Sequence, residues 1–166
     1  MANEEEIVEQ TRDDKRFYKL PLYFDGFLEQ FADTEVPEGV DFPTCSELES
    51  IDQHLGLILT TCPGEHLFNP DYGCGIWDMD FERVVSRQRW EDRFTEHILQ
   101  AVSKFEKRLT NVTAGIRVAD TVREDAATRT TAIKKKVSVQ INGRLVSDDA
   151  NCGFRYTLFL GPLTTE

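Results

Sequence analysis

The amino-acid sequence predicts an α+β fold: two main helices packed on a small antiparallel β-meander, with an extended N-terminal arm. Two stretches in the first two thirds of the chain repeat apolar residues at helical spacing. Three later stretches alternate apolar and polar residues, as half-buried strands do. Short polar turns join these three stretches, which favours antiparallel neighbours.

The N-terminal part of the chain is acidic. The whole chain of 166 residues has 30 Asp and Glu against 19 Lys and Arg, and residues 1–50 hold 14 of the acids with only 4 of the bases. We expect residues 1–16 to form an acidic, mobile N-terminal arm and residues 17–166 to form a single domain. The aromatic stretch that follows contains Pro21, which favours extended geometry, so the arm at 17–24 could widen the sheet. Residues 32–43 read as a linker.

The first helix is predicted to begin at Thr44. Glu47 lies three residues later, which is the spacing of a capping box. The Pro63-Gly64 pair should end this helix, and residues 64–78 should be irregular. The apolar stripe consists of Leu48, Ile51, Leu55 and Ile58.

The second helix is predicted from about Ser86 to about Leu109. Arg and Glu residues fill the face opposite its apolar stripe, at spacings that allow intrahelical ion pairs. The stripe consists of Trp90, Phe94, Ile98, Ala101, Phe105 and Leu109.

Three strands are predicted after this helix. Apolar residues alternate with polar or small ones at 112–118, 133–141 and 152–160, and polar turns separate the three stretches at 123–129 and 147–151. The result is a three-stranded antiparallel meander.

Charge and composition limit the possible functions. A net charge of −11 repels phosphate backbones, so we expect no nucleic acid as a partner. No apolar run approaches the roughly 20 residues of a membrane span, so we expect no direct membrane insertion. The acidic start does not resemble a signal peptide and the four cysteines form no CxxC pair. We therefore expect a cytoplasmic protein with reduced thiols.

The irregular segment offers three weak possibilities for chemistry. Cys62, His66 and Cys74 could bind zinc, with Cys45, Cys152 or His54 as a distant fourth ligand. Two of the acids Glu65, Asp71 and Asp78 could serve a glycosidase. A Cys62 nucleophile paired with His66 is disfavoured because Pro63-Gly64 would break the aligning helix. Buried cysteines and solvated acids explain the same residues, so we expect no catalytic residue, no metal and no cofactor.

One segment resembles a known family. The runs Ser50 to Leu55, Leu57 to Glu65 and Pro70 to Gly75 look like the signature of the contractile-tail baseplate wedge, or sheath-initiator, family. Its members include a myophage baseplate wedge protein and TssE of type VI secretion systems. Two departures stand out, because the family commonly has Arg where this chain has His66 and often a basic residue where it has Asn69.

The resemblance implies a structural role in a baseplate. The chain would contact other wedge subunits (TssF-, TssG- and TssK-like) and the sheath subunits, and would lie at the inner membrane if the apparatus is a secretion system. The implied wedge-docking residues are Glu65, His66, Pro70, Tyr72, Gly73 and Gly75.

A small meander also leaves unpaired strand edges, which invite strand addition. Together with the resemblance, this predicts that strand 131–142 or strand 152–160 pairs with sheath arms. The residues assigned to that contact are Val137, Val139, Ile141, Phe154, Tyr156 and Leu158.

Two other classes of function stay open on the sequence. One is a peptidoglycan-cleaving, lysozyme-like hydrolase of a tail-like particle, with Glu65 as general acid. The other is a free-standing module that binds extended peptides. The sequence also leaves open whether the apparatus is a phage tail, a secretion system or another contractile injector; the resemblance alone favours type VI secretion.

Overall fold

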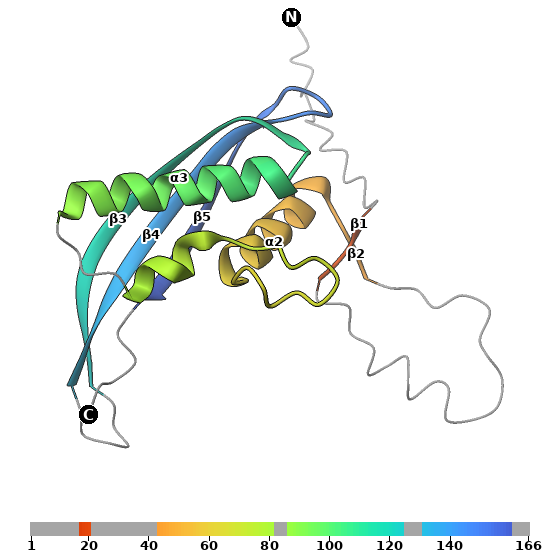
Figure 1. Ribbon diagram of the computed structural model, residues 1–166. Helices are drawn as coiled ribbons and strands as arrows, with labels where there is room; N and C mark the ends of the chain where they lie inside the picture. The colour runs from red at the N-terminus through yellow and green to blue at the C-terminus, as the bar shows by residue number, and fades with distance from the viewer. Residues whose placement is uncertain (1–16, 21–42, 82–85, 125–130, 161–166) are drawn as a thin grey trace, which may run out of the picture. The chain divides into compact units, whose positions relative to one another are not determined.

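The computed structural model describes residues 17–20, 43–81, 86–124 and 131–160 (Figure 1). The chain divides into two compact units, residues 1–50 and residues 51–166. The predicted arm at 1–16 and the predicted linker up to residue 42 lie outside the described residues.

The first unit contains two short paired strands. β1 (Phe17–Tyr18) pairs antiparallel with β2 (Thr44–Cys45), and the Lys19 N–H donates to the Pro43 carbonyl oxygen at 2.8 Å. These strands form a sheet of their own, separate from the three-stranded sheet. The prediction that the arm widens the meander is therefore wrong for Phe17 and Tyr18, because their ladder partner is β2.

Helix α2 spans Glu47–Thr60 and begins two residues later than a Thr44 cap would require. The Ser46 Oγ accepts the Glu49 N–H at 3.2 Å, so Ser46 is the cap. The Thr44 capping box is wrong because Thr44 belongs to β2, while Ser46 and Glu49 have the same three-residue spacing. Ile51, Leu55 and Ile58 are buried as predicted, together with Leu59.

Leu48 departs from the predicted stripe. Its side chain is 46% exposed, whereas the other three predicted positions are fully buried. The buried stripe of α2 therefore starts at Ile51, one turn later than predicted.

The segment after α2 is irregular until a short 3-10 helix, η1 (Gly75–Phe81). The Trp77 Nε1–H donates to the Leu59 carbonyl oxygen at 3.0 Å, which ties η1 to the last turn of α2. This bond satisfies one of the carbonyls that a helix end leaves without an intrahelical partner.

Helix α3 spans Arg87–Phe105 and confirms the second predicted helix. It ends four residues before the predicted end, because Leu109 already pairs with Leu145 in the sheet. Within the described chain no helix has the length and apolar character needed to cross a membrane. The buried residues of α3 are Trp90, Phe94, Ile98, Ala101 and Val102.

The sheet contains β3 (Leu109–Glu124), β4 (Thr131–Leu145) and β5 (Asn151–Leu160) in the order β3-β4-β5. Both pairings are antiparallel, which confirms the meander. The β3–β4 register shifts between Thr110 and Thr113, and Asn111 there has a φ of 50°. The β4–β5 register runs without a shift from Lys135 opposite Leu160 to Arg144 opposite Asn151.

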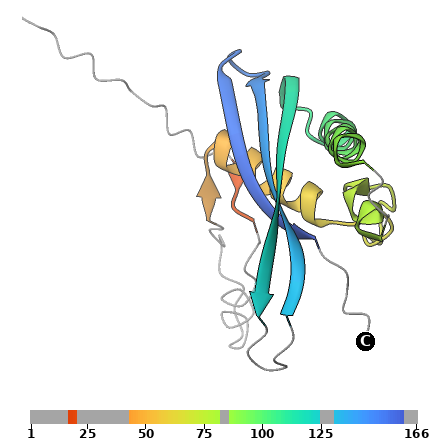
Figure 2. The ribbon, with the colours of Figure 1, turned by 90° about the vertical axis from the view of Figure 1, so that its left-hand side faces the viewer.

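The two helices and the sheet form two layers within residues 51–166. α3 lies along one face of the sheet in Figure 1 and is seen end-on beside it in Figure 2. The α2 side meets β5, since the Tyr156 hydroxyl donates to the Asp52 carboxylate at 2.6 Å. The buried core lies between the layers, where Ile58, Phe94 and Val139 belong to one cluster. The predicted fold class is confirmed.

Candidate functional site

The 61–75 loop connects α2 to η1 and is closed at its base by a tight backbone approach. The Cys74 N–H donates to the Thr61 carbonyl oxygen at 2.9 Å. Gly73 has a φ of +121°, and a Cβ at this position would lie 2.4 Å from the same carbonyl oxygen. Both the backbone conformation and the space require glycine here.

Hydrogen bonds join the Pro-Gly-Glu turn to the Pro-Asp-Tyr-Gly turn. The Gly64 N–H donates to the Pro70 carbonyl oxygen at 2.7 Å, and Gly64 has a φ of +95°. Glu65 is exposed, and its Oε2 accepts the Cys62 N–H at 2.8 Å. The two turns that carry the sequence signature therefore form one hydrogen-bonded unit.

A cluster of aromatic rings around Tyr72 packs against this unit. The Tyr72 ring lies 5.0 Å from the Phe105 ring, 5.5 Å from His66 and 6.0 Å from His54, measured between centroids. His66 Nδ1 accepts the Asn69 N–H at 3.0 Å, so His66 also fixes the loop backbone. Burial, and then the negative charge of Glu106, raises the pKa of Tyr72, which keeps its hydroxyl neutral.

Two large apolar side chains project from the tip of the loop into solvent. Leu67 is 83% exposed and Phe68 is 89% exposed, the two highest values among the exposed large apolar residues that the structure describes. Exposed apolar side chains on a loop fixed by hydrogen bonds are typical of contact sites for other proteins. Leu67 and Phe68 are not among the predicted docking residues, although their position between the two turns was a usable signal.

The remaining predicted docking residues fall into two groups. Pro70 is exposed, with Glu65 and His66. Gly73 is buried and Gly75 is half-buried, and a Cβ on Gly75 would lie 2.8 Å from His97 Nδ1. The glycines therefore shape the loop from within, whereas the other residues form its surface.

A buried carboxylate lies where α3 passes into β3. Glu106 is 2% exposed, and its Oε2 accepts the His54 Nδ1–H at 2.8 Å and an Arg108 Nη2–H at 2.6 Å. Its Oε1 accepts the Arg108 backbone N–H at 3.0 Å. Because an ionised carboxylate can only accept, these bonds place the proton of the His54 ring on Nδ1.

These bonds hold Glu106 ionised despite its burial. Burial alone would raise the pKa of Glu106, but hydrogen bonds from Arg108 and His54 outweigh it and lower the pKa to about 2. The cluster joins α2, the end of α3 and the start of β3. The predicted helix ran through Glu106 to Leu109, where this carboxylate would be one more charge on a solvated helix face.

The structure corrects one half of the predicted strand-addition contact. β4 is the central strand and pairs with β3 on one side and β5 on the other over residues 135–144. Val137, Val139 and Ile141 are buried under the helices. Strand 131–142 therefore cannot accept a further strand over these residues, because its backbone groups are already paired.

β5 lies at an edge of the sheet, as strand addition requires. Phe154 and Leu158 are each 7% exposed, and burial together with the hydrogen bond to Asp52 raises the pKa of Tyr156 well above its usual range. These three side chains hold β5 on the helical layer. The part of β5 that could meet a partner strand is its outer backbone.

Among the described residues the structure does not assemble the zinc site considered above. Among the residues it describes, no three His, Cys, Asp or Glu side chains are grouped to hold a metal ion, so Cys62, His66 and Cys74 do not form a zinc site. Burial raises the pKa of the Cys74 thiol to about 11. Burial, followed by the charges of Asp78 and Glu65, also raises that of Cys62. Both effects disfavour a reactive thiolate.

Comparison with known proteins identifies relatives of this fold. The profile of the family described as baseplate wedge protein gp25 matches residues 45–150. No curated protein sequence is significantly similar to the chain.

The solved structures that resemble the chain include the following two. A proposed tail lysozyme from Geobacter sulfurreducens is 21% identical, with a TM-score of 0.52 over 76% of this chain and all of the other. A chain of the baseplate complex from the type VI secretion system is 16% identical, with a TM-score of 0.44 over 67% of this chain and 91% of the other.

The family match covers well over half of the chain, including the 61–75 loop, both main helices and the first two strands of the meander. The structural likeness to the Geobacter protein agrees in fold. The chain belongs to the family of the baseplate wedge protein gp25.

Proposed function

We propose that this chain is a structural subunit of a contractile injection apparatus of the type VI secretion kind. It docks on the baseplate wedge through the 61–75 loop and starts the first sheath ring by strand addition at β5. Membership of the baseplate wedge family supports the assembly role. Its partners on this proposal are TssF-, TssG- and TssK-like wedge subunits and the sheath subunits.

The observation that carries the docking half of the proposal is the tip of the 61–75 loop. The loop is fixed before any partner binds, by the bonds from Gly64 to Pro70 and from Cys74 to Thr61. Pre-ordering lowers the entropy that docking must overcome. Leu67 and Phe68 then supply apolar side chains that a partner pocket can bury, with exposed Glu65 and His66 beside them.

The sheath half of the proposal depends on the order of the strands. An edge strand offers unpaired N–H and C=O groups to any compatible extended segment. β5 offers ten residues in an unbroken register with β4. The buried side of β5 is fixed on the helical layer by Phe154 and Leu158, so a sheath arm would meet a rigid template.

The geometry of Glu65 favours an assembly role over hydrolysis. A glycosidase requires a general acid in apolar surroundings beside a second carboxylate. Glu65 is exposed, and one of its oxygens accepts the Cys62 N–H within the loop. Its carboxylate therefore has a structural partner already, and we propose that the chain has no catalytic activity.

Co-purification of the full chain with wedge subunits tests the docking half. Combined Leu67→Ala and Phe68→Ala substitution should weaken wedge binding by about a thousandfold, since two buried apolar anchors of about 2 kcal/mol each contribute about 4 kcal/mol. The melting temperature should not change, because both side chains are exposed. The control is Val146→Ala, which removes a side chain that is 60% exposed on the turn after β4.

Unchanged wedge binding by the double variant would contradict docking through the loop tip. Cell-wall cleavage by the purified chain that Glu65→Gln abolishes would instead support the hydrolase.

A further inference from the structure

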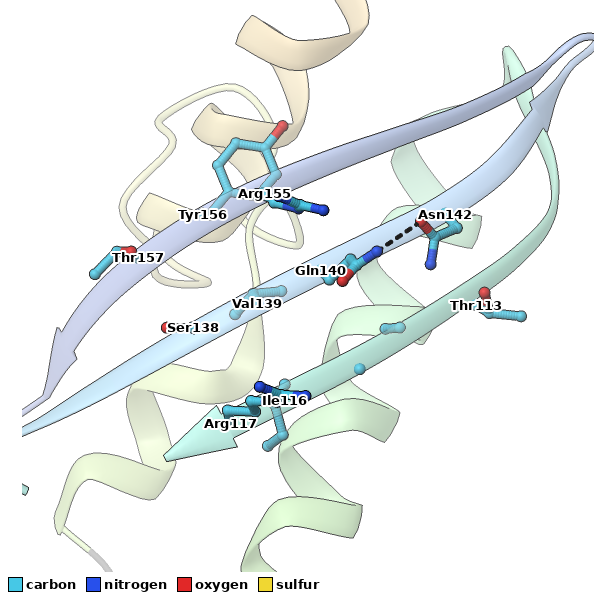
Figure 3. Close-up of a pocket in the computed structure, with 12 residues that line it drawn as sticks. Thr113, Ile116, Arg117, Ser138, Val139, Gln140, Asn142, Arg155, Tyr156 and Thr157 are labelled. Atoms are coloured by element: carbon cyan, nitrogen blue, oxygen red, sulfur yellow. Dashed lines mark hydrogen bonds between the residues drawn. The ribbon is translucent and has the colours of Figure 1, made fainter. Parts of the chain in front are cut away.

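One face of the three-stranded sheet points away from α2 and α3, and we name it the open face. This face carries a broad hollow (Figure 3). The hollow has a volume of about 850 Å³ and is lined by residues of β3, β4 and β5. Within residues 51–166 no described helix lies on this face (Figure 2). Because successive side chains of a strand point to opposite faces of the sheet, the side chains on the open face are not those that form the core.

The open face is cationic although the chain is acidic. Arg117 of β3 and Arg155 of β5 line the hollow, and no acidic side chain lines it. Between them the floor consists of small or uncharged polar residues of all three strands, whereas the whole chain has a net charge of −11. The floor residues are Thr113, Gly115, Ser138, Gln140, Asn142 and Thr157.

The two arginines differ in their partners from Arg87, Arg108 and Arg144 of the same unit. Arg87 pairs with Glu91 at 3.0 Å, Arg108 with Glu106 at 2.6 Å and Arg144 with Asp149 at 2.9 Å. Within the described chain neither Arg117 nor Arg155 takes part in a salt bridge. Both arginines are exposed, so their two guanidinium groups are accessible to a ligand on the open face.

The strand register fixes how these groups lie. Arg117 is opposite Ser138 and Ser138 is opposite Thr157, while Gln140 separates Gly115 from Arg155. The arginines therefore stand on the two outer strands, roughly 10 Å apart across the sheet and offset by two residues along it. Gly115 has no side chain and Ser138 has a small one, so little side-chain volume fills the space between the two arginines.

We propose that the open face binds an extended acidic segment of a partner protein, with one carboxylate on Arg117 and another on Arg155. A planar guanidinium binds a carboxylate through two parallel hydrogen bonds, which gives direction as well as affinity. The Gln140 amide and the Thr157 hydroxyl can bind backbone or polar groups of the segment between the two arginines. This inference does not rest on the proposed function, since it concerns a face distinct from the 61–75 loop and from the outer backbone of β5.

A polypeptide fits this face better than a nucleic acid. The net charge of −11 repels a continuous chain of phosphates over long distances. Two isolated guanidinium groups over a floor of amides and hydroxyls instead match two separated carboxylates.

Fluorescence anisotropy with the full chain tests the proposal. The probe is a labelled ten-residue peptide of alternating Glu and Ser, and its control is the same peptide with Gln in place of Glu. The acidic peptide should bind at low salt, where exposed charges are least screened, and the Gln peptide should not. Arg117→Glu combined with Arg155→Glu should weaken binding by about tenfold or more.

The matched control is Lys104→Glu combined with Lys107→Glu. It changes the net charge by the same amount at exposed sites outside the open face and should leave binding within about twofold. Equal loss in both double variants would show a general charge effect and overturn the proposal. Absence of binding, equal binding of the Gln peptide, or tighter binding of duplex DNA would overturn it as well. Because the assay uses the isolated chain, its result is independent of wedge co-purification.

Discussion

Glu106 shows how one buried charge can tie three elements together. Its carboxylate binds His54 on α2 and Arg108, the residue before β3, and it lies directly after the last residue of α3. Removing one member of such a cluster leaves the others without a partner in a poorly solvated place, which costs more than the net value of the bonds. This residue therefore matters for stability beyond its single charge.

Glu106→Gln should lower the free energy of unfolding at pH 7 by roughly 3 kcal/mol. The folded pKa of about 2 lies below the ordinary value of 4.5, so the stabilisation is present above pH 4.5 and is lost as the pH falls toward 2. Urea unfolding at pH 7 and at pH 2.5 should show the difference between the wild-type chain and the variant shrinking at the lower pH. A constant difference would contradict a carboxylate held ionised by its partners.

Gly73 provides a second test at the level of one residue. Gly73→Ala should lower the free energy of unfolding by about 2–4 kcal/mol and weaken wedge docking, because the new Cβ would press on the Thr61 carbonyl. Gly64→Ala is the matched control: its φ is +95° but no atom lies within 4 Å of the new Cβ. It should cost about 1 kcal/mol, from backbone strain alone. Thermal and urea unfolding of both variants measure the contrast, and equal losses would argue against the steric reason.

At the scale of elements, local patterns predicted the type of each element better than its limits or its place. The alternation around Val139 identified a strand, and the stripe from Trp90 to Ala101 identified a helix, because burial on one face imposes those periods. Whether a strand lies at the centre or at the edge of a sheet depends on pairing between distant segments. The predicted meander nevertheless already placed the strand around Val139 between two neighbours, so assigning strand addition to strand 131–142 was inconsistent with that topology.

The helix starts illustrate the same limit. Thr44 and Ser46 both precede an acid at capping spacing, and only the pairing of Thr44 in β2 decides between them. Within the candidate site the sequence signature located the 61–75 loop. It did not distinguish the glycines that shape the loop from the apolar side chains at its tip, since exposure is a property of the folded loop.

Proline substitutions on β5 test the proposed edge. Along an edge strand, backbone N–H groups point alternately toward the neighbouring strand and away from it. Cys152 and Thr157 of β5 are an odd number of residues apart, so their N–H groups point in opposite directions. Two variants are therefore made, Cys152→Pro and Thr157→Pro, each of which removes one backbone N–H. The variant that keeps its melting temperature has lost only an outward N–H and should block sheath growth while wedge binding persists. Alanine at the same position is the control, and normal sheaths nucleated by the stable proline variant would contradict strand addition at β5.

At the scale of the whole molecule, the buried apolar residues that the structure describes all lie between Cys45 and Leu160. Residues 1–16 are predicted to form an arm outside the domain of residues 17–166, and deletion of residues 1–16 tests that boundary. The shortened chain should melt within about 2 °C of the full chain, because it keeps every described core residue. A large fall in melting temperature by circular dichroism would show that residues 1–16 contribute to the fold.

The two borders of the sheet are not equivalent. The β3 side begins with a register shift at Thr110–Thr113 and a residue of positive φ, features that discourage pairing, whereas the β5 side is regular along its length. If a sheath arm adds to the sheet, each copy then accepts one arm on one side. Growth from such a seed has a built-in direction, because only one border of each copy accepts an arm.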